Sequence, residues 1–199
     1  MNIYDELPKE ELEMAKVDFI KHHIAAAIRT ESDFKKALKS DVDMIFLLHA
    51  NIMTVGDCIR EIHEAGKKAM VHIDFAEGIG KDKYGIEFLA KQGVDGICTT
   101  RTNIVRLTRQ YNLLSLQRFF MIDSHSVSTS IESMKLSNPD IVEIMPAIVT
   151  KKIKEFSSLI DVPVIAGGLV ENEQEARDAL AAGADCVSTG EADLWNLKL

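Results

Sequence analysis

The residues with the clearest potential for binding chemistry lie in two stretches near the end of the 199-residue sequence. Gly167 and Gly168 end one apolar run, and Ser188, Thr189 and Gly190 end another. A glycine has no Cβ, so backbone N–H groups there can approach an anion closely, and the hydroxyls add further donors. These stretches predict a phosphate site; the alternative is that the glycines serve only to form tight turns.

Charged residues also stand at the ends of apolar runs or within them, namely Arg29, Asp74 and Glu143. An unpaired carboxylate in an apolar strand is costly, so Asp74 and Glu143 must each have a partner or a ligand. They could accept hydrogen bonds from the hydroxyls of a polyol, or one of them could be a general base. The alternative is an internal ion pair with an arginine. Arg29 could hold an anionic ligand by forked hydrogen bonds.

A stretch without acidic residues runs from Gly96 to Ile122. Its arginines Arg101, Arg106 and Arg118 are candidates for contacts to RNA phosphates, because Lys and Arg supply most of the affinity for a nucleic-acid backbone. The formal net charge of −8 argues against a protein that coats nucleic acid. The alternative is that these arginines form a solvated helix face.

Other kinds of chemistry are not indicated. The three cysteines are widely spaced and form no CxxC, which argues against a disulfide framework or a zinc knuckle. His72 precedes Asp74 by two residues, but no second histidine stands nearby in an HxH or HxxxH arrangement, so we expect a hydrogen-bonded histidine and no metal site. No lysine lies at the end of an apolar run, which argues against a Schiff-base aldolase.

Eight short apolar runs alternate with stretches of helical spacing along the chain. Runs that are apolar on both faces suit parallel strands covered by helices. We therefore predict an α/β fold, a compact single-domain (β/α)8 TIM-type barrel with an extra N-terminal helix; a doubly wound open sheet is the alternative. The absence of GxGxxG after the first run favours the barrel. The runs span residues 23–28, 43–48, 69–74, 96–100, 113–120, 141–146, 162–168 and 186–190.

In such a barrel, ligands bind at the carboxyl ends of the strands, and a phosphate usually lies at the loops after strands seven and eight beside a small extra helix. The glycine pair and the sequence Ser-Thr-Gly fall at those two places, and EADLW (191–195) can begin a one-turn helix. Glu191 and Asp193 in that turn would compete with a bound phosphate.

The first twenty residues form an acidic segment, in which Leu12, Ala15 and Phe19 are spaced for one helical face. We predict an N-terminal acidic helical extension over residues 1–20 and the barrel over residues 21–199. No run of about eighteen uncharged apolar residues is present, and the N-terminus does not have the pattern of a signal peptide. We therefore expect a cytoplasmic protein that does not associate with membranes.

Several segments together resemble the glycerol-3-phosphate-responsive antiterminators, the regulators of glycerol uptake operons. The most particular segments are HIDFAEGIGKDKYGIEFL (72–89) and QRFFMIDS (117–124), and the matching segments run in order over nearly all of residues 22–196. The sequence departs from the family in one loop, where Pro146 and Ala147 replace the usual Pro-Gly.

The resemblance implies a non-catalytic barrel that binds glycerol 3-phosphate, needs no cofactor, and favours an antiterminator form of an mRNA leader. Carried over residue by residue, it assigns the phosphate to Gly167, Gly168, Thr189 and Gly190. It leaves Arg29, Asp74 and Glu143 for the glycerol part, and Arg101, Arg106 and Arg118 as the leading RNA contacts.

Two other functions stay open. One is an isomerase or epimerase acting on a small phosphorylated substrate, with Asp74 or Glu143 as the base. The other is a sensor of a phosphorylated metabolite that signals to a protein partner. A regulatory role also needs a moving part, and we expect the glycine-containing loop at residues 75–85 to become ordered when the ligand binds. A homodimer is possible, because one small barrel offers limited surface to a structured RNA.

Overall fold

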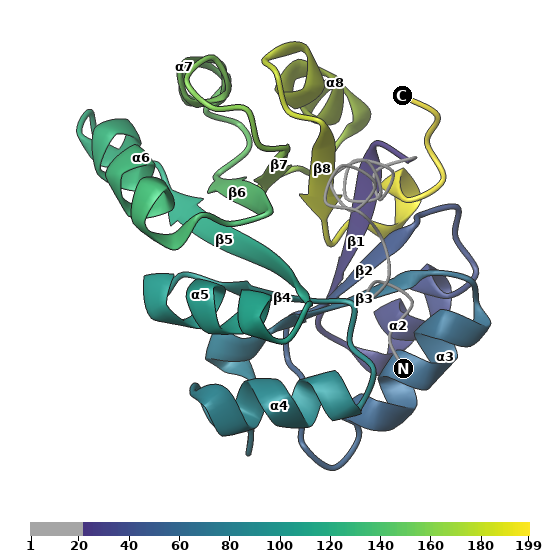
Figure 1. Ribbon diagram of the computed structural model, residues 1–199. Helices are drawn as coiled ribbons and strands as arrows, with labels where there is room; N and C mark the ends of the chain where they lie inside the picture. The colour runs from purple at the N-terminus through teal and green to yellow at the C-terminus, as the bar shows by residue number, and fades with distance from the viewer. Residues whose placement is uncertain (1–21) are drawn as a thin grey trace, which may run out of the picture.

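The computed structural model describes residues 22–199 and shows a closed barrel of parallel strands in the order β1 to β8 (Figure 1). The pairing of β8 with β1 closes the barrel, which confirms the predicted fold and excludes the open sheet. The helix predicted within residues 1–20 lies outside the described residues. The strands are β1 (Ile24–Ile28), β2 (Met44–Leu47), β3 (Lys68–His72), β4 (Gly96–Thr99), β5 (Leu114–Phe120), β6 (Ile141–Met145), β7 (Val164–Gly167) and β8 (Cys186–Thr189).

The helices lie around the outside of the sheet, as Figure 1 shows. Two short 3-10 helices follow β3 and β8, and the second of them is the one-turn helix expected from EADLW. Within residues 22–199 no helix is both long and apolar enough to cross a membrane. The helices are α2 (Glu31–Ala37), α3 (Val55–Glu64), η2 (Ile73–Phe75), α4 (Lys83–Lys91), α5 (Thr102–Gln110), α6 (Ser126–Ser137), α7 (Thr150–Ser157), α8 (Glu173–Ala181) and η3 (Ala192–Leu194).

Local signals in the sequence set where several helices begin and end. The Asn172 side chain accepts the backbone N–H of Glu175 at 3.1 Å, so it caps α8 by satisfying a donor that has no partner inside the helix. Gly183 follows α8 with φ of 104°, and Gly66 follows α3 with φ of 74°. Both glycines adopt the left-handed backbone that ends a helix at little steric cost.

Successive side chains of each strand point to opposite faces, either into the barrel or toward the helices. In β5, Leu116 belongs to the apolar interior, whereas Phe119 packs on Phe156 of α7 with ring centroids 5.9 Å apart. Gln117 also faces the helices, where its amide donates to the Ser133 hydroxyl at 3.1 Å.

The barrel interior changes character along its axis. Its lower part is filled by apolar side chains such as Phe46, Met70, Leu116, Ile141 and Ile165, all of them buried. The next inward positions toward the carboxyl ends are polar or small: His72, Arg118, Glu143, Gly167 and Ser188. The apolar lower part therefore supports a polar layer directly beneath the mouth of the barrel.

Candidate functional site

A cavity of about 300 Å³, called the mouth cavity below, opens at the carboxyl ends of the strands. It confirms that the loops after β7 and β8 border a common space, together with β1 and the end of β6. The predicted site residues in its lining are Arg29, Arg118, Gly168, Ser188, Thr189 and Gly190. Gly167, Asp74 and Glu143 are not among the lining residues.

A buried ion pair between neighbouring strands lies beneath this cavity, and its arginine reaches the cavity lining. Arg118 of β5 and Glu143 of β6 are register partners, and Arg118 Nε donates to Glu143 Oε2 at 2.6 Å. The other oxygen, Oε1, accepts the Ser188 hydroxyl of β8 at 2.9 Å. Burial is the largest single influence and lowers the pKa of Arg118, but the charge and hydrogen bond of Glu143, with smaller contributions from Cys98 and Asp74, together outweigh it and raise the pKa. The arginine is therefore charged at any physiological pH.

Two site predictions are corrected by this ion pair. Arg118 is only 7% exposed and points into the barrel, so it cannot be the RNA contact that the acid-free stretch predicted. Glu143 is fully buried with both oxygens occupied, which matches the internal ion pair held open as the alternative and not a direct contact to the glycerol part.

Gly167 lies in β7 directly against the Glu143 carboxylate. A Cβ on Gly167 would stand 2.4 Å from Glu143 Oε1 and 3.1 Å from the Ser188 hydroxyl oxygen. The missing side chain therefore makes room for the buried carboxylate. This finding replaces the predicted reason, a close approach of a phosphate to that residue.

Gly168 and Leu169 form the wall of the cavity after β7. Both have left-handed backbones, with φ of 79° and 61°, and the Leu169 side chain is 61% exposed. A Cβ on Gly168 would stand 2.7 Å from the terminal carbon of Met145. The N–H of Ala147 donates to the carbonyl of Gly167 at 2.8 Å. The loop after β6 is therefore held against β7 even though Ala147 replaces the usual glycine of the family.

The loop after β8 is tied to the loop after β7. The Thr189 hydroxyl donates to the carbonyl of Val170 at 2.8 Å and accepts the N–H of Glu191 at 3.1 Å. The Trp195 indole donates to the Thr189 carbonyl at 3.0 Å. The Thr189 hydroxyl is therefore engaged in joining the two loops. A Cβ on Gly190 would have its nearest atom, the carbonyl oxygen of Ala27, at 3.5 Å, an ordinary contact, so a side chain there would not clash.

Asp74 lies away from the cavity and organises the loop after β4. It accepts the Thr99 hydroxyl at 2.9 Å, and the N–H and hydroxyl of Thr100 at 2.8 and 3.0 Å. Arg101 Nε stands 3.3 Å from its Oδ1. Burial works to raise the pKa of Asp74, but the hydrogen bonds from Thr100 and Thr99 prevail and lower it. These partners oppose the prediction that Asp74 is free to bind glycerol.

His72 was predicted to be hydrogen-bonded, and within residues 22–199 the structure shows that it is not. Both ring nitrogens are buried, and neither has a hydrogen-bond partner among the described residues. The ring lies 4.7 Å from that of Phe75, measured between centroids. Burial, together with the positive charge of Arg118, lowers the pKa of His72 from 6.5 to about 4, so the ring is neutral. Among residues 22–199 no three or more His, Cys, Asp or Glu side chains are grouped so that they could hold a metal ion.

The remaining candidates for RNA contacts lie on α5. Arg101 stands just before the helix with its side chain 54% exposed, and Arg106 is exposed on the helix itself. Arg109, from the same stretch, donates to the carbonyl of Asn138 and so connects α5 to the end of α6. Two of the three predicted RNA contacts therefore stay accessible.

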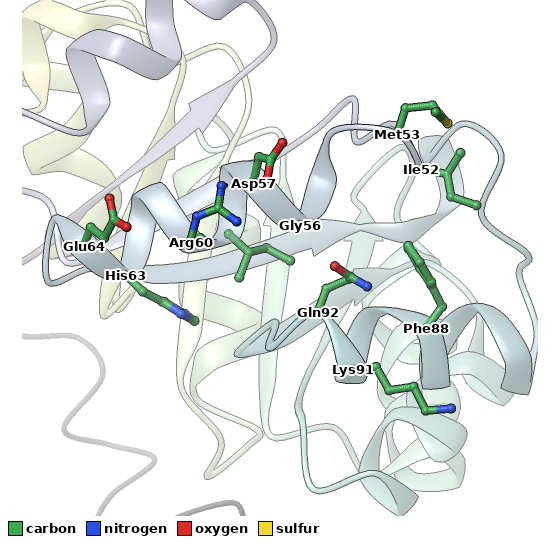
Figure 2. Close-up of a pocket in the computed structure, with 11 residues that line it drawn as sticks. Ile52, Met53, Gly56, Asp57, Arg60, His63, Glu64, Phe88, Lys91 and Gln92 are labelled. Atoms are coloured by element: carbon green, nitrogen blue, oxygen red, sulfur yellow. Dashed lines mark hydrogen bonds and ion pairs between the residues drawn. The ribbon is translucent and has the colours of Figure 1, made fainter.

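A second hollow, of about 730 Å³, is a surface groove between α3 and α4 (Figure 2). Figure 2 shows Ile52, Met53 and Phe88 at one end of it. Three side chains along it have partners close by: Arg60 donates to Asp57 at 2.7 Å, Lys91 donates to Glu87 at 2.7 Å, and His63 Nε2 lies 2.7 Å from Asp95 Oδ2. The groove therefore lacks the converging free donors of the mouth cavity.

The alternation of residues along β5 indicates on which face of the strand Arg118 lies. In LSLQRFF, Leu114, Leu116 and Arg118 occupy every second position, so the arginine shares the interior face with two leucines. That spacing could have placed Arg118 inside the barrel. The carboxylates at the cavity's rim, Asp33 and Glu171, were missed, because no local pattern in their segments links them to the strand ends.

Comparison with known proteins supports one family over almost the whole chain. The model of the family described as "Glycerol-3-phosphate responsive antiterminator" matches residues 24–195. A protein of Escherichia coli (strain K12), named "Uncharacterized protein YgcP", is 33% identical over 175 residues, which cover 87% of this chain and 92% of that protein.

Two solved structures are similar in both sequence and fold. The glycerol uptake operon antiterminator regulatory protein from Listeria monocytogenes is 30% identical, with a TM-score of 0.84 over 89% of this chain and 96% of that one. A glycerol uptake operon antiterminator-related protein from Thermotoga maritima is 31% identical, with a TM-score of 0.78 over 86% and 96%. The chain belongs to the glycerol-3-phosphate responsive antiterminator family.

Proposed function

We infer that this protein is a cytoplasmic, RNA-binding transcription antiterminator for glycerol uptake and metabolism genes, and that glycerol 3-phosphate is its effector. The observation that carries the proposal is the mouth cavity of about 300 Å³, which gathers Arg29, Arg118 and the two glycine loops in a member of this family. An effector bound there would favour the protein conformation that stabilises the antiterminator form of the leader RNA.

The cavity offers complementary groups to both ends of such a ligand. Arg29 at the end of β1 and the backbone N–H groups near Gly168 and Gly190 suit the phosphate. The carboxylates of Glu171 and Glu191 at the rim would accept hydrogen bonds from the glycerol hydroxyls. A ligand held between these loops would couple the ends of β1, β7 and β8.

A binding role is favoured over catalysis by the state of the candidate base. Glu143 has both oxygens occupied and is fully buried, so it is unsuited to take a proton from a substrate. Asp74 already accepts bonds from Thr99 and Thr100. The isomerase or epimerase alternative therefore lacks an available base at either predicted position.

The RNA would contact the protein through α5, where Arg101 and Arg106 are exposed. The deciding experiment is a gel shift with the leader RNA of a glycerol operon at stated salt, with and without glycerol 3-phosphate. We expect a ligand-dependent shift, weakened in R101Q/R106Q with a salt slope shallower by about 2, since each phosphate contact contributes about 1.

The matched control is R60Q/R177Q, which removes two arginines that are exposed on other helices, α3 and α8. This variant should shift the RNA as the unaltered protein does. If no shift is seen at low salt with or without the ligand, the RNA-binding function is wrong. A sensor that signals to a protein partner would then take its place.

A further inference from the structure

Arg118 has hydrogen-bonding capacity that the protein itself does not use. Its guanidinium carries five N–H donors. Only Nε–H has a partner among residues 22–199, the Glu143 carboxylate. The side chain lines the mouth cavity although it is 7% exposed. The terminal nitrogens therefore face the cavity from below.

Three neighbouring groups fix the position of this guanidinium. Glu143 holds Nε at 2.6 Å, and the Ser188 hydroxyl holds the other oxygen of Glu143 at 2.9 Å, so β5, β6 and β8 are linked through one carboxylate. Gly167 of β7 leaves the space in which that carboxylate lies. A donor held in this way loses little conformational freedom when it binds a ligand.

Stability alone does not account for such a pair. Replacing a buried ion pair by apolar residues of similar volume is often neutral or stabilising, because both charges must be taken out of water. Here the pair lies next to an apolar layer that such residues would extend. The charge on Arg118 is therefore better explained by something that it binds.

The distribution of charge in the cavity indicates where an anionic group would lie. Asp33, Glu171 and Glu191 line its outer part and repel an anion there. Arg118 lies at the floor, where low dielectric strengthens its attraction for a negative charge. The lining also includes small residues, Ala27 and Gly190, whose side chains take up little of the cavity.

We propose that Arg118 is a ligand-binding residue that donates to two oxygens of a phosphate monoester from the barrel interior, and that Glu143 is its positioning residue. A planar guanidinium with free terminal donors matches two oxygens of one phosphate better than a single hydroxyl. The identity of the ester as glycerol 3-phosphate rests on the proposed function. The role of Arg118 toward the phosphate rests on the cavity and its contacts.

Calorimetric titration of the full chain with glycerol 3-phosphate, and separately with inorganic phosphate, tests this role. The variant R118Q/E143Q removes both charges together, so no unpaired charge is left in the barrel. We expect its affinity for both probes to fall about 10- to 100-fold, the range for loss of a charge-assisted hydrogen bond. R60Q, which changes an exposed arginine of α3, is the control and should bind as the unaltered protein does.

R118K separates a binding role from a packing role. It keeps the charge but loses the forked geometry, so we expect affinity between that of the unaltered protein and that of R118Q/E143Q. A folded R118Q/E143Q that binds both phosphates within threefold of the unaltered protein overturns the proposal. If the double variant does not fold, an R118K protein with unchanged affinity overturns it instead.

The outcome is distinguishable from that of the proposed function. Arg118-dependent phosphate binding without any RNA shift would support the role of Arg118 and refute the antiterminator function. A glycerol-3-phosphate-dependent RNA shift that persists unchanged in R118Q/E143Q would support the antiterminator function and refute the role of Arg118. If the unaltered protein binds neither glycerol 3-phosphate nor inorganic phosphate, the role of Arg118 is wrong.

Discussion

Gly167 is a glycine because of what lies beside it inside the barrel. The Glu143 carboxylate occupies the place of its side chain, so the residue that most suggested a phosphate loop in the sequence serves the ion pair beneath the site. Gly168, its neighbour, lines the cavity itself. The two adjacent positions are therefore glycine for two separate physical reasons.

Substitution of Gly167 by alanine should destabilise the protein. Its Cβ would lie 2.4 Å from Glu143 Oε1 and would displace the carboxylate from Arg118, so we expect a loss of about 1–3 kcal/mol in the free energy of unfolding. Urea unfolding of G167A measures this loss. G190A is the control, because a Cβ on Gly190 would have its nearest neighbour at 3.5 Å and would not clash. Equal stabilities of the two variants would contradict this account.

Glu143→Gln tests whether that residue contacts the ligand or only positions Arg118. Removing one charge of a buried pair should lower the free energy of unfolding by about 3 kcal/mol, because Arg118 loses its counter-charge. A bound phosphate would restore a negative partner. We therefore expect glycerol 3-phosphate to raise the melting temperature of E143Q more than that of the unaltered protein; a smaller rise would mean that Glu143 itself binds the ligand.

His72 should make stability depend on pH between about 6.5 and 4. Its pKa falls from 6.5 to about 4 in the folded state, so below pH 6.5 the unfolded chain takes up a proton that the folded protein does not. Stability is therefore lost as the pH falls, by about 3 kcal/mol over this window. Urea unfolding of H72Q should show a smaller loss over the same range. An unchanged pH profile in H72Q would contradict the neutral, unpartnered histidine.

Among the elements, the loop at residues 75–85 does not fit its expected role as the moving part. Glu77 N donates to the carbonyl of Ala50 at 2.8 Å, and Lys81 Nζ donates to that of Ala76 at 2.8 Å. A Cβ on Gly85 would stand 1.8 Å from the Gly80 carbonyl oxygen, so the two ends of the turn are in close contact. None of this loop lines the mouth cavity.

The loop after β7 is the better candidate for an element that responds to the ligand. It lines the cavity, and Leu169 keeps an exposed side chain on a left-handed backbone, a conformation that is costly for residues other than glycine. Hydrogen exchange at residues 168–172 should slow when glycerol 3-phosphate binds, whereas exchange at residues 75–85 should change little. Protection confined to residues 75–85 would restore the original expectation.

At the scale of the whole molecule, regulation requires that the ligand distinguish two conformations. Moving a population from 1:99 to 99:1 takes about 5.5 kcal/mol of differential binding. A ligand held between β1, β5, β7 and β8 contacts strands from across the barrel, so it can favour one arrangement of the mouth loops over another. For the proposed RNA binding, the formal charge of −8 means that contact would be restricted to local basic surface such as that of α5.

The homodimer remains a prediction, which rests on the small size of one barrel. One barrel of 22.1 kDa offers limited surface to a structured RNA, so a pair of barrels would present two α5 surfaces. Light scattering coupled to gel filtration should give twice the mass of the chain, and the RNA titration should saturate at one leader per two chains. A monomeric mass together with full RNA affinity would contradict the dimer.

The sequence by itself determined the order and type of the elements. Eight apolar runs with helical stretches between them predicted the barrel. Local residues such as Asn172 and Gly183 set where α8 begins and ends, because these signals depend on residues close in the chain. The motifs quoted from residues 72–89 and 117–124 also pointed to the correct family.

Only the tertiary structure decided what each site residue contacts. Arg118 meets Glu143 across 25 residues of sequence, and Glu143 meets Ser188 across 45, because strand register and barrel closure bring those positions together. The same composition would have allowed Arg118 to face RNA and Gly167 to face a phosphate. Which face of a strand a residue occupies, and which distant strand lies beside it, depends on packing of the whole barrel, and no short segment contains that information.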